Sequence, residues 1–209
     1  MREPDGTIRI FSGGKFEYRK GQDLVIAAFR EFVKSHPEAH LVCAWHNPWP
    51  QLIFDALQRS TLLIQSITGA ATQQNLFARV LIENGIPPEN FTILPQLSHT
   101  ALAREMANTD FGLFPNRCEG GNNLMLQEYA SCGRRVVANA MTGHADVSVA
   151  ITQRIHATED ENRWAVQTTE EIAYSLKGAM MHAMLYPDMN PVPVWTWEAA
   201  ARTVLAALS

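Results

Sequence analysis

The chain has 209 residues, 46% of them hydrophobic, and a formal net charge of −4 from 17 basic and 21 acidic residues. This length is typical of one domain and suffices to bury a core without disulfides or metals. The charge balance provides no basic field, so we expect no nucleic-acid partner. The chain has no apolar run long enough for a membrane span, and its first ten residues lack the apolar stretch of a secretory signal.

The cysteines favour a reducing compartment. Cys43, Cys118 and Cys132 are an odd number at wide spacing, and no C-x-x-C pair occurs. We therefore expect free, buried thiols, a cytoplasmic location and no structural zinc site.

Short apolar runs alternate with longer amphipathic segments along the chain. The first predicted elements are a strand over 8–12 closed by Gly13 and Gly14, a helix over 22–34 and a strand over 40–45. The stretch 47–72 stays open, with a helix over 52–57 and either a strand or a helix over 61–67. The remaining predicted elements are a helix over 74–84 stopped by Gly85, a strand over 91–97, a helix to residue 108 capped by Ser98, a strand over 111–115, a helix over 123–131, strands over 135–139 and 152–155, and helices over 168–185 and 197–208.

Strands that alternate with helices predict an α/β fold, with β-α-β units, a parallel sheet and helices on both of its faces. Ligands of such sheets bind outside the carboxyl ends of the strands, at the place where the strand order reverses. We therefore expect the residues that carry chemistry in the loops that follow the predicted strands.

The first such loop, residues 13–21, follows the first predicted strand. Gly13 and Gly14 allow a close approach of the backbone to a ligand, and Lys15, Arg19 and Lys20 place three cations within six residues. Lysine and arginine both bind phosphate. The loop has neither the P-loop pattern nor the dinucleotide fingerprint. The alternative is a tight turn whose charges are simply solvated.

The second loop lies in the segment 114–128, where an apolar strand passes through Gly120 and Gly121 into a helix. A helix N-terminus with free amides is an anion site, and Asn122 or Asn123 can cap it. Glu119 precedes the helix. Glu128 lies within it and could accept hydrogen bonds from the vicinal hydroxyls of a ribose. The alternatives are that Glu119 caps the turn and that Glu128 pairs with Arg134 or Arg135.

Together these segments resemble a known family. Residues 11–26 look like the opening of the C-terminal domain of retaining, group 1 glycosyltransferases, and 119–138 look like the region of these enzymes that carries two spaced glutamates. Residues 98–115 resemble the helix and strand between the two segments. The resemblance implies a Rossmann-like domain that is one half of a GT-B enzyme and binds a nucleoside-diphosphate sugar.

The resemblance assigns roles by position. Lys20 matches the lysine that contacts the donor diphosphate, and Lys15 stands where the family usually has arginine. Glu128 matches the glutamate that binds the ribose. Glu119 matches the glutamate near the donor sugar, although eight residues separate the two glutamates here instead of seven. Glu119 and Lys20 are the catalytic candidates, and the donor-binding candidates are Gly13, Gly14, Lys15, Lys20, Glu128 and a diphosphate cradle at Asn123, Leu124 and Met125.

The implied reaction moves a sugar from a nucleoside diphosphate to an acceptor, with cations and the helix N-terminus stabilising the leaving diphosphate. No D-x-D motif is present, and we expect no metal or other cofactor. The family has a second, N-terminal domain for the acceptor. The chain thus reads as a single domain over 1–209, with 1–7 as a linker remnant and 194–209 as a terminal helix, whose partner half lies in a longer chain or another subunit.

Two other functions stay open. One is a non-catalytic module that binds a nucleotide or nucleotide sugar as a subunit or regulator. The other is a flavodoxin-like or receiver domain, which is disfavoured because no acidic cluster follows the first strand. Weaker candidate residues are His144, either facing the pocket or satisfied in its loop, and Trp45 and Trp49, which either face a second domain or cover the core.

Overall fold

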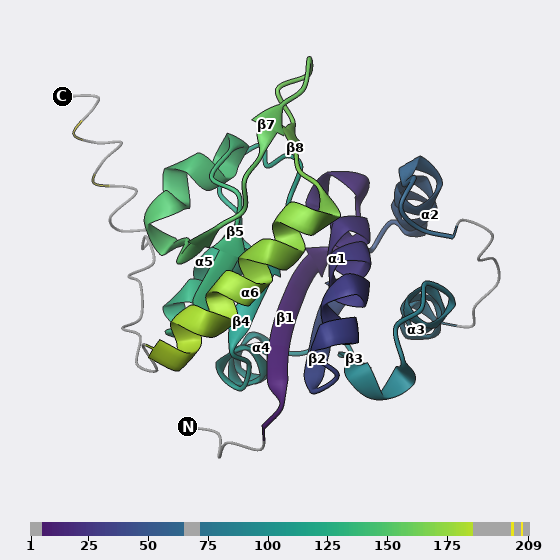
Figure 1. Ribbon diagram of the computed structural model, residues 1–209. Helices are drawn as coiled ribbons and strands as arrows, with labels where there is room; N and C mark the ends of the chain where they lie inside the picture. Colours follow the sequence, from purple (N-terminus) through teal and green to yellow (C-terminus); the bar gives the residue numbers. More distant parts are fainter. Residues whose placement is uncertain (1–5, 65–71, 186–201, 203–205, 207–209) are drawn as a thin grey trace.

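The computed structural model describes residues 6–64, 72–185, 202 and 206. A parallel sheet of six strands, in the order β3-β2-β1-β4-β5-β6, forms its centre. This confirms the predicted α/β, Rossmann-like fold, and Figure 1 shows the sheet with helices on both faces. Its strands are β1 (Ile8–Lys15), β2 (Ala39–His46), β3 (Phe91–Ile93), β4 (Phe111–Phe114), β5 (Arg135–Ala138) and β6 (Gln153–Arg154).

The other elements connect these strands or follow them. The helices are α1 (Gln22–Ser35), α2 (Pro50–Arg59), α3 (Gln73–Glu83), α4 (His99–Ala107), α5 (Leu124–Ser131) and α6 (Thr169–Leu185). Three 3-10 segments are η1 (Tyr18–Lys20), η2 (Pro88–Asn90) and η3 (Thr142–Ala150). An antiparallel hairpin of β7 (Thr158–Glu159) and β8 (Ala165–Val166) precedes α6.

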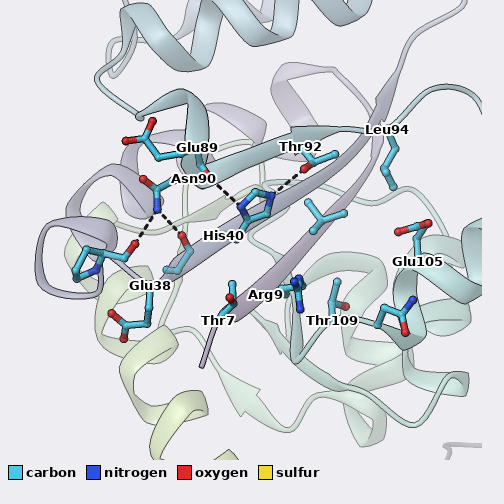
Figure 2. Close-up of a pocket in the computed structure, with 14 residues that line it drawn as sticks. Thr7, Arg9, Glu38, His40, Glu89, Asn90, Thr92, Leu94, Glu105 and Thr109 are labelled. Carbon is cyan, nitrogen blue, oxygen red and sulfur yellow. Dashed lines mark hydrogen bonds between the residues drawn. The ribbon is translucent and has the colours of Figure 1, made fainter. Parts of the chain in front are cut away.

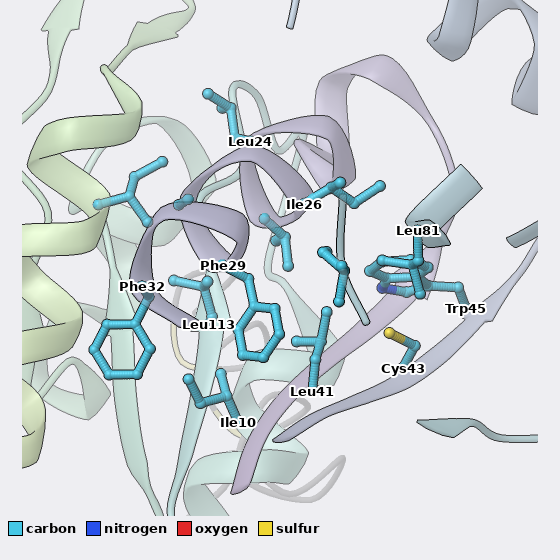
Figure 3. Close-up of a cluster of buried hydrophobic side chains, with 14 of the residues drawn as sticks. Ile10, Leu24, Ile26, Phe29, Phe32, Leu41, Cys43, Trp45, Leu81 and Leu113 are labelled. Carbon is cyan, nitrogen blue, oxygen red and sulfur yellow. The ribbon is translucent and has the colours of Figure 1, made fainter. Parts of the chain in front are cut away.

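The larger core lies between one face of the sheet and the helices α1, α3 and α6 that cover it. Figure 3 shows Phe29 and Phe32 of α1 among sheet residues such as Ile10 and Leu41. All four side chains are fully buried, because α1 places apolar residues at helical spacing toward the sheet. A smaller core under α4 and α5 occupies the opposite face.

The structure corrects two predicted strand ends and one predicted element. Gly13 and Gly14 do not close the first strand but lie within β1, where they pair with Ala44 and Trp45 of the equally long β2. The strand predicted over 91–97 ends at Ile93. Residues 61–64 form neither a strand nor a helix, while 65–67 lie outside the described residues.

Two predicted helix ends are confirmed, and two predicted terminal segments fall largely outside the described residues. Ser98 caps α4 by accepting a hydrogen bond from the Ala101 amide, and Gly85 follows the end of α3 with a φ of 84°. The helix expected over 197–208 lies outside the described residues except for 202 and 206. The linker expected over 1–7 likewise falls outside them except for 6 and 7.

Cys43 is buried, whereas Cys118 and Cys132 are partly exposed, which corrects the prediction that all three thiols are buried. Burial raises the pKa of the Cys43 thiol and keeps it protonated. Among the residues that the structure describes, no helix has the length and apolarity needed to span a membrane. Within the same residues, no three potential metal-ligating side chains form a cluster.

Candidate functional site

The strand order reverses between β1 and β4, which are direct neighbours in the sheet. The loop after β1 leads through η1 into α1, and the loop after β4 leads into α5. Both loops leave the carboxyl edge of the sheet, where ligands of open α/β sheets bind. The two segments singled out from the sequence therefore meet at this one edge.

Backbone hydrogen bonds tie the two loops together. The Arg19 carbonyl accepts hydrogen bonds from the amides of Arg117 and Cys118, at 2.8 and 3.1 Å. Gly21, with a φ of 74°, packs so closely that a Cβ would lie 2.4 Å from the Pro115 carbonyl oxygen. Only glycine tolerates this backbone conformation and this approach. The loop after β1 is thus fixed against the loop after β4.

An ion pair also joins the loop after β4 to the start of α1. Arg117 binds the carboxylate of Asp23, in the first turn of α1, through two hydrogen bonds of 2.7 and 2.9 Å. Its guanidinium also lies 4.0 Å from the centroid of the Tyr18 ring. Such paired hydrogen bonds fix geometry as well as charge. Arg117 therefore sets the position of η1, which carries Lys20.

Glu119 is the centre of the polar cluster at this edge. Its buried carboxylate receives hydrogen bonds from the Lys20 ammonium and the Asn116 amide on Oε1, and from Arg19 Nη1 at 3.1 Å on Oε2. Its backbone amide donates to Thr142 Oγ1 at 3.1 Å. The structure thus brings together the two predicted catalytic residues, Glu119 and Lys20.

The N-terminus of α5 lies beside this cluster. The Asn123 side chain caps the helix by accepting a hydrogen bond from the Leu126 amide at 3.3 Å. A Cβ on Gly13 would lie 3.0 Å from Met125 Cγ, so the end of β1 closely approaches the helix. The first amides of a helix have no acceptor within it and attract anions. Gly14 has a φ of 118°, and a Cβ there would meet nothing within 4 Å.

His144, in η3, contacts the residue that caps α5. It is fully buried, and its Nδ1 lies 3.2 Å from the Asn139 carbonyl oxygen while its Nε2 lies 2.9 Å from Asn123 Nδ2. A carbonyl only accepts, so Nδ1 carries the proton and Nε2 accepts from Asn123. Burial lowers the pKa of His144 to about 4. Of the two interpretations offered for this residue, the satisfied loop histidine is correct.

Two predicted residues lie apart from the cluster. The Lys15 ammonium is 4.4 Å from the centroid of the Trp49 ring, which is 49% exposed. The Glu128 carboxylate is 3.7 Å from His99 Nδ1 at the start of α4. Among the described residues, Glu128 forms no ion pair with Arg134 or Arg135, the two surface partners considered for it. By contrast with Trp49, Trp45 is buried and belongs to the core.

Asn116 and Thr142, which both bind Glu119, were not among the predicted site residues. Nothing near them in the sequence marks them, because their contacts depend on how the loops after β4 and β5 meet. Thr142 has a φ of 51°, an unfavourable conformation for a β-branched residue. Such outliers gather where the surrounding structure holds the backbone for function.

A groove of about 750 Å³ lies at the opposite end of the strands and includes Arg9, His40 and Thr92 (Figure 2). Both ring nitrogens of His40 are engaged, Nδ1 with the Glu89 carbonyl at 3.0 Å and Nε2 with Thr92 Oγ1 at 2.8 Å. Because ligands of parallel sheets bind at the carboxyl ends of strands, we place the candidate site at the Glu119 cluster and not in this groove.

No family model and no curated protein matches the sequence, whereas solved structures match the fold. The C-terminal domain of the group 1 glycosyltransferase LpcC from Francisella tularensis has a TM-score of 0.56 and 16% identity, over 85% of this chain and 77% of that domain. WaaG, a glycosyltransferase involved in lipopolysaccharide biosynthesis, has a TM-score of 0.59 and 17% identity, over 87% of this chain and 40% of that one.

A structure of the trehalose-6-phosphate enzyme from E. coli bound with UDP-2-fluoro glucose has a TM-score of 0.55 and 18% identity, over 86% of this chain and 37% of that one. The chain therefore spans well under half of these two longer neighbours. It has the fold of the C-terminal domain of GT-B glycosyltransferases, as the resemblance implied.

Proposed function

We propose that the chain is the donor-binding half of a glycosyltransferase and holds a nucleoside-diphosphate sugar at the carboxyl edge of β1 and β4. The observation that carries the proposal is the contact of Lys20 with Glu119 at this edge, beside the N-terminus of α5. The match in fold to glycosyltransferase domains supports the same function, and one neighbour was solved with a uridine-diphosphate sugar analogue.

The proposed mechanism stabilises the charge that develops on the leaving diphosphate. The amides of Leu124 and Met125 supply positive potential in a position fixed before the donor arrives, and Lys20 adds its charge by turning from Glu119 to the diphosphate. Glu119 lies beside the donor sugar, and Glu128 accepts hydrogen bonds from the ribose hydroxyls. Gly13 and Gly14 leave room for the donor, and Lys15 turns from Trp49 to a phosphate oxygen.

We also propose that the reaction needs no metal ion, because side chains and a helix N-terminus provide the positive charge. The groups that bind the acceptor belong to a second, N-terminal domain, in the same longer chain or in a partner subunit. Closure of two domains over the donor would exclude water from the reacting bond. The chain by itself would then bind the donor without transferring its sugar.

Calorimetric titration tests the donor site. Uridine, guanosine and adenosine diphosphates are titrated into the wild-type chain and into Lys20→Ala, and the corresponding nucleosides serve as comparison ligands. The preferred diphosphate should lose at least about tenfold in affinity in Lys20→Ala, since hydrogen bonds to charged groups are worth about 1.5–3 kcal/mol. Nucleoside binding should change little.

Lys34→Ala is the matched control, because Lys34 is exposed on α1 and pairs only locally with Glu31, at 2.7 Å. Its nucleotide affinity should equal that of the wild type. Equal losses for diphosphate and nucleoside in Lys20→Ala would contradict the role of Lys20. A wild-type chain that binds none of the three diphosphates would contradict the proposed function itself.

A further inference from the structure

Two cations share the single carboxylate of Glu119. Lys20 binds Oε1, and Arg19 Nη1 binds Oε2 at 3.1 Å. Arg19 also reaches a second carboxylate, because its Nε lies 2.8 Å from Glu17 Oε2. The four side chains therefore carry two positive and two negative charges. Without a ligand, the charges of these four side chains cancel, and none of the cations is left over to bind a phosphate.

A balanced cluster creates a difficulty for donor binding. If Lys20 turns toward a diphosphate, it leaves Glu119, whose side chain is only 6% exposed. A buried carboxylate that loses its partner is strongly destabilised. A lysine that was the only cation on Glu119 would therefore be held back, and donor affinity would fall.

We infer that Arg19 is a positioning residue: it compensates the buried Glu119 carboxylate, so that Lys20 can leave Glu119 for the donor diphosphate. Arg19 and the neutral Asn116 remain on Glu119 when Lys20 moves. The part of this inference that concerns the donor rests on the proposed function. The claim that either cation alone can compensate Glu119 does not.

The geometry assigns the two cations different tasks. Arg19 is fixed on both sides, by its ion pairs with Glu17 and Glu119 and by its carbonyl, which accepts from the amides of Arg117 and Cys118. Lys20 ends η1, and its compact ammonium can form hydrogen bonds in any direction. The lysine is thus the cation that can change partners, and the arginine is the one that stays.

The first test measures thermal stability without ligand. Arg19→Met and Lys20→Met each keep most of the side-chain length and remove the charge. Each should lower Tm by about 2–4 °C, as expected for a modest loss of stability in a domain of this size. The double variant should lower Tm by at least about twice the sum of the single losses, because Glu119 then has no cation.

The excess loss should disappear in a Glu119→Gln background, where no buried charge needs compensation. Arg59→Met combined with Lys20→Met is the control, because Arg59 pairs with Asp55 and not with Glu119, and it should show only additive losses. Additive losses for Arg19→Met with Lys20→Met would overturn the inference, because the two cations would then not substitute for each other.

The second test measures the affinity of the preferred nucleoside diphosphate. Arg19→Met should weaken binding about tenfold in the wild-type background and leave it unchanged in the Glu119→Gln background, because Arg19 acts only through Glu119. Lys20→Met should weaken binding in both. An equal loss for Arg19→Met in both backgrounds would mean that Arg19 touches the phosphate, and no loss in either would mean that it has no role in binding; both results overturn the inference.

The two tests also separate this inference from the proposed function. If the wild-type chain binds no nucleoside diphosphate, the proposed function fails. The thermal stabilities of the single and double variants still decide whether Arg19 and Lys20 can each compensate Glu119. If the chain binds the diphosphate but the Tm losses of Arg19→Met and Lys20→Met are additive, the proposed function stands and the inference about Arg19 fails.

Discussion

Asn123 and His144 are joined by a hydrogen bond of 2.9 Å between Asn123 Nδ2 and His144 Nε2. Because His144 Nε2 accepts a hydrogen bond, the Asn123 side chain must turn its Nδ2 donor toward the histidine and its Oδ1 toward α5. The freed Oδ1 accepts from the Leu126 amide and caps α5. A buried, neutral histidine therefore sets the orientation of the cap at the proposed diphosphate site.

This relationship predicts a loss of stability in acid. The pKa of His144 is lowered, mainly by burial, from 6.5 to about 4, against an opposing effect of Glu119. Between these two pH values the unfolded chain binds a proton that the folded chain does not, so stability falls as the pH falls from about 6.5 to about 4. The loss attributable to His144 is about 3 kcal/mol. Urea denaturation at a series of pH values measures it.

The comparison variant is His144→Gln, which offers one donor and one acceptor but does not titrate. Its stability should fall less over the same pH range, and above pH 7 its difference from the wild type should be constant. His99→Gln, which removes an exposed histidine, should follow the wild type. Parallel curves for the wild type and His144→Gln would show that His144 titrates normally and is not buried as described.

The close contact between the loops after β4 and β5 predicts a steric effect. A Cβ on Gly143 would lie 1.8 Å from the Gly121 carbonyl oxygen, and the Gly143 amide donates to the Glu119 carbonyl at 3.1 Å. Gly143→Ala should therefore move the loop that holds Glu119, lower stability by at least about 1–3 kcal/mol and weaken nucleotide binding.

Gly120→Ala is a control in the same loop, because a Cβ there would meet nothing within 4 Å. Thermal denaturation and nucleotide titration of both variants give the comparison. Gly120→Ala should resemble the wild type in both measurements. If Gly143→Ala did so as well, the close approach of the two loops would be wrong.

The ribose assignment of Glu128 predicts a loss that depends on the sugar hydroxyls. Glu128→Gln keeps the size of the side chain and removes its charge, so affinity for the nucleoside diphosphate should drop about tenfold to a hundredfold. The wild type should also bind a 2′,3′-dideoxy diphosphate more weakly, whereas Glu128→Gln should discriminate little between the two ligands. His99→Gln tests whether the contact with His99 contributes. Unchanged affinity in folded Glu128→Gln would refute the assignment.

The proposed need for a second domain predicts binding without transfer. The purified chain is mixed with a radiolabelled nucleotide sugar and a panel of acceptors, with and without a metal chelator. We expect no product from the chain alone, because in the proposed function the acceptor groups and the closure that excludes water belong to a second domain. Transfer at about 1 per second or faster, an ordinary enzymatic rate, would contradict this prediction.

The sequence predicted the elements whose signals are local. Ser98 and Gly85 mark helix ends by their own chemistry, and both predictions agree with the structure. Gly13 and Gly14 also carry a local signal, for a turn, yet they lie within β1. The reason is not local: β2 is equally long and extends the pairing past them. The hairpin β7–β8 is built from two-residue strands, too short for a periodic pattern to reveal.

The same distinction applies to the candidate site. Lys20 and Glu119 were identified from their sequence segments, but their contact depends on β1 and β4 being neighbours in the sheet. Asn116 was missed and Arg19 received no specific role, because both act through Glu119 and have no motif of their own. Residue types at strand ends therefore indicated the position of the candidate site. The ion pairs that balance the charge of Glu119 could be identified only in the folded chain.

The most direct test of the central claim maps where a nucleoside diphosphate binds, by amide chemical shifts of the isotope-labelled chain. Saturation with the preferred diphosphate should shift the amide signals of Gly14, near the carboxyl end of β1, and of Leu124 and Met125, at the start of α5. The amides of His40 and Thr92, in the groove at the opposite end of the strands, should not move. Shifts confined to that groove, or no shifts at millimolar diphosphate, would contradict the account.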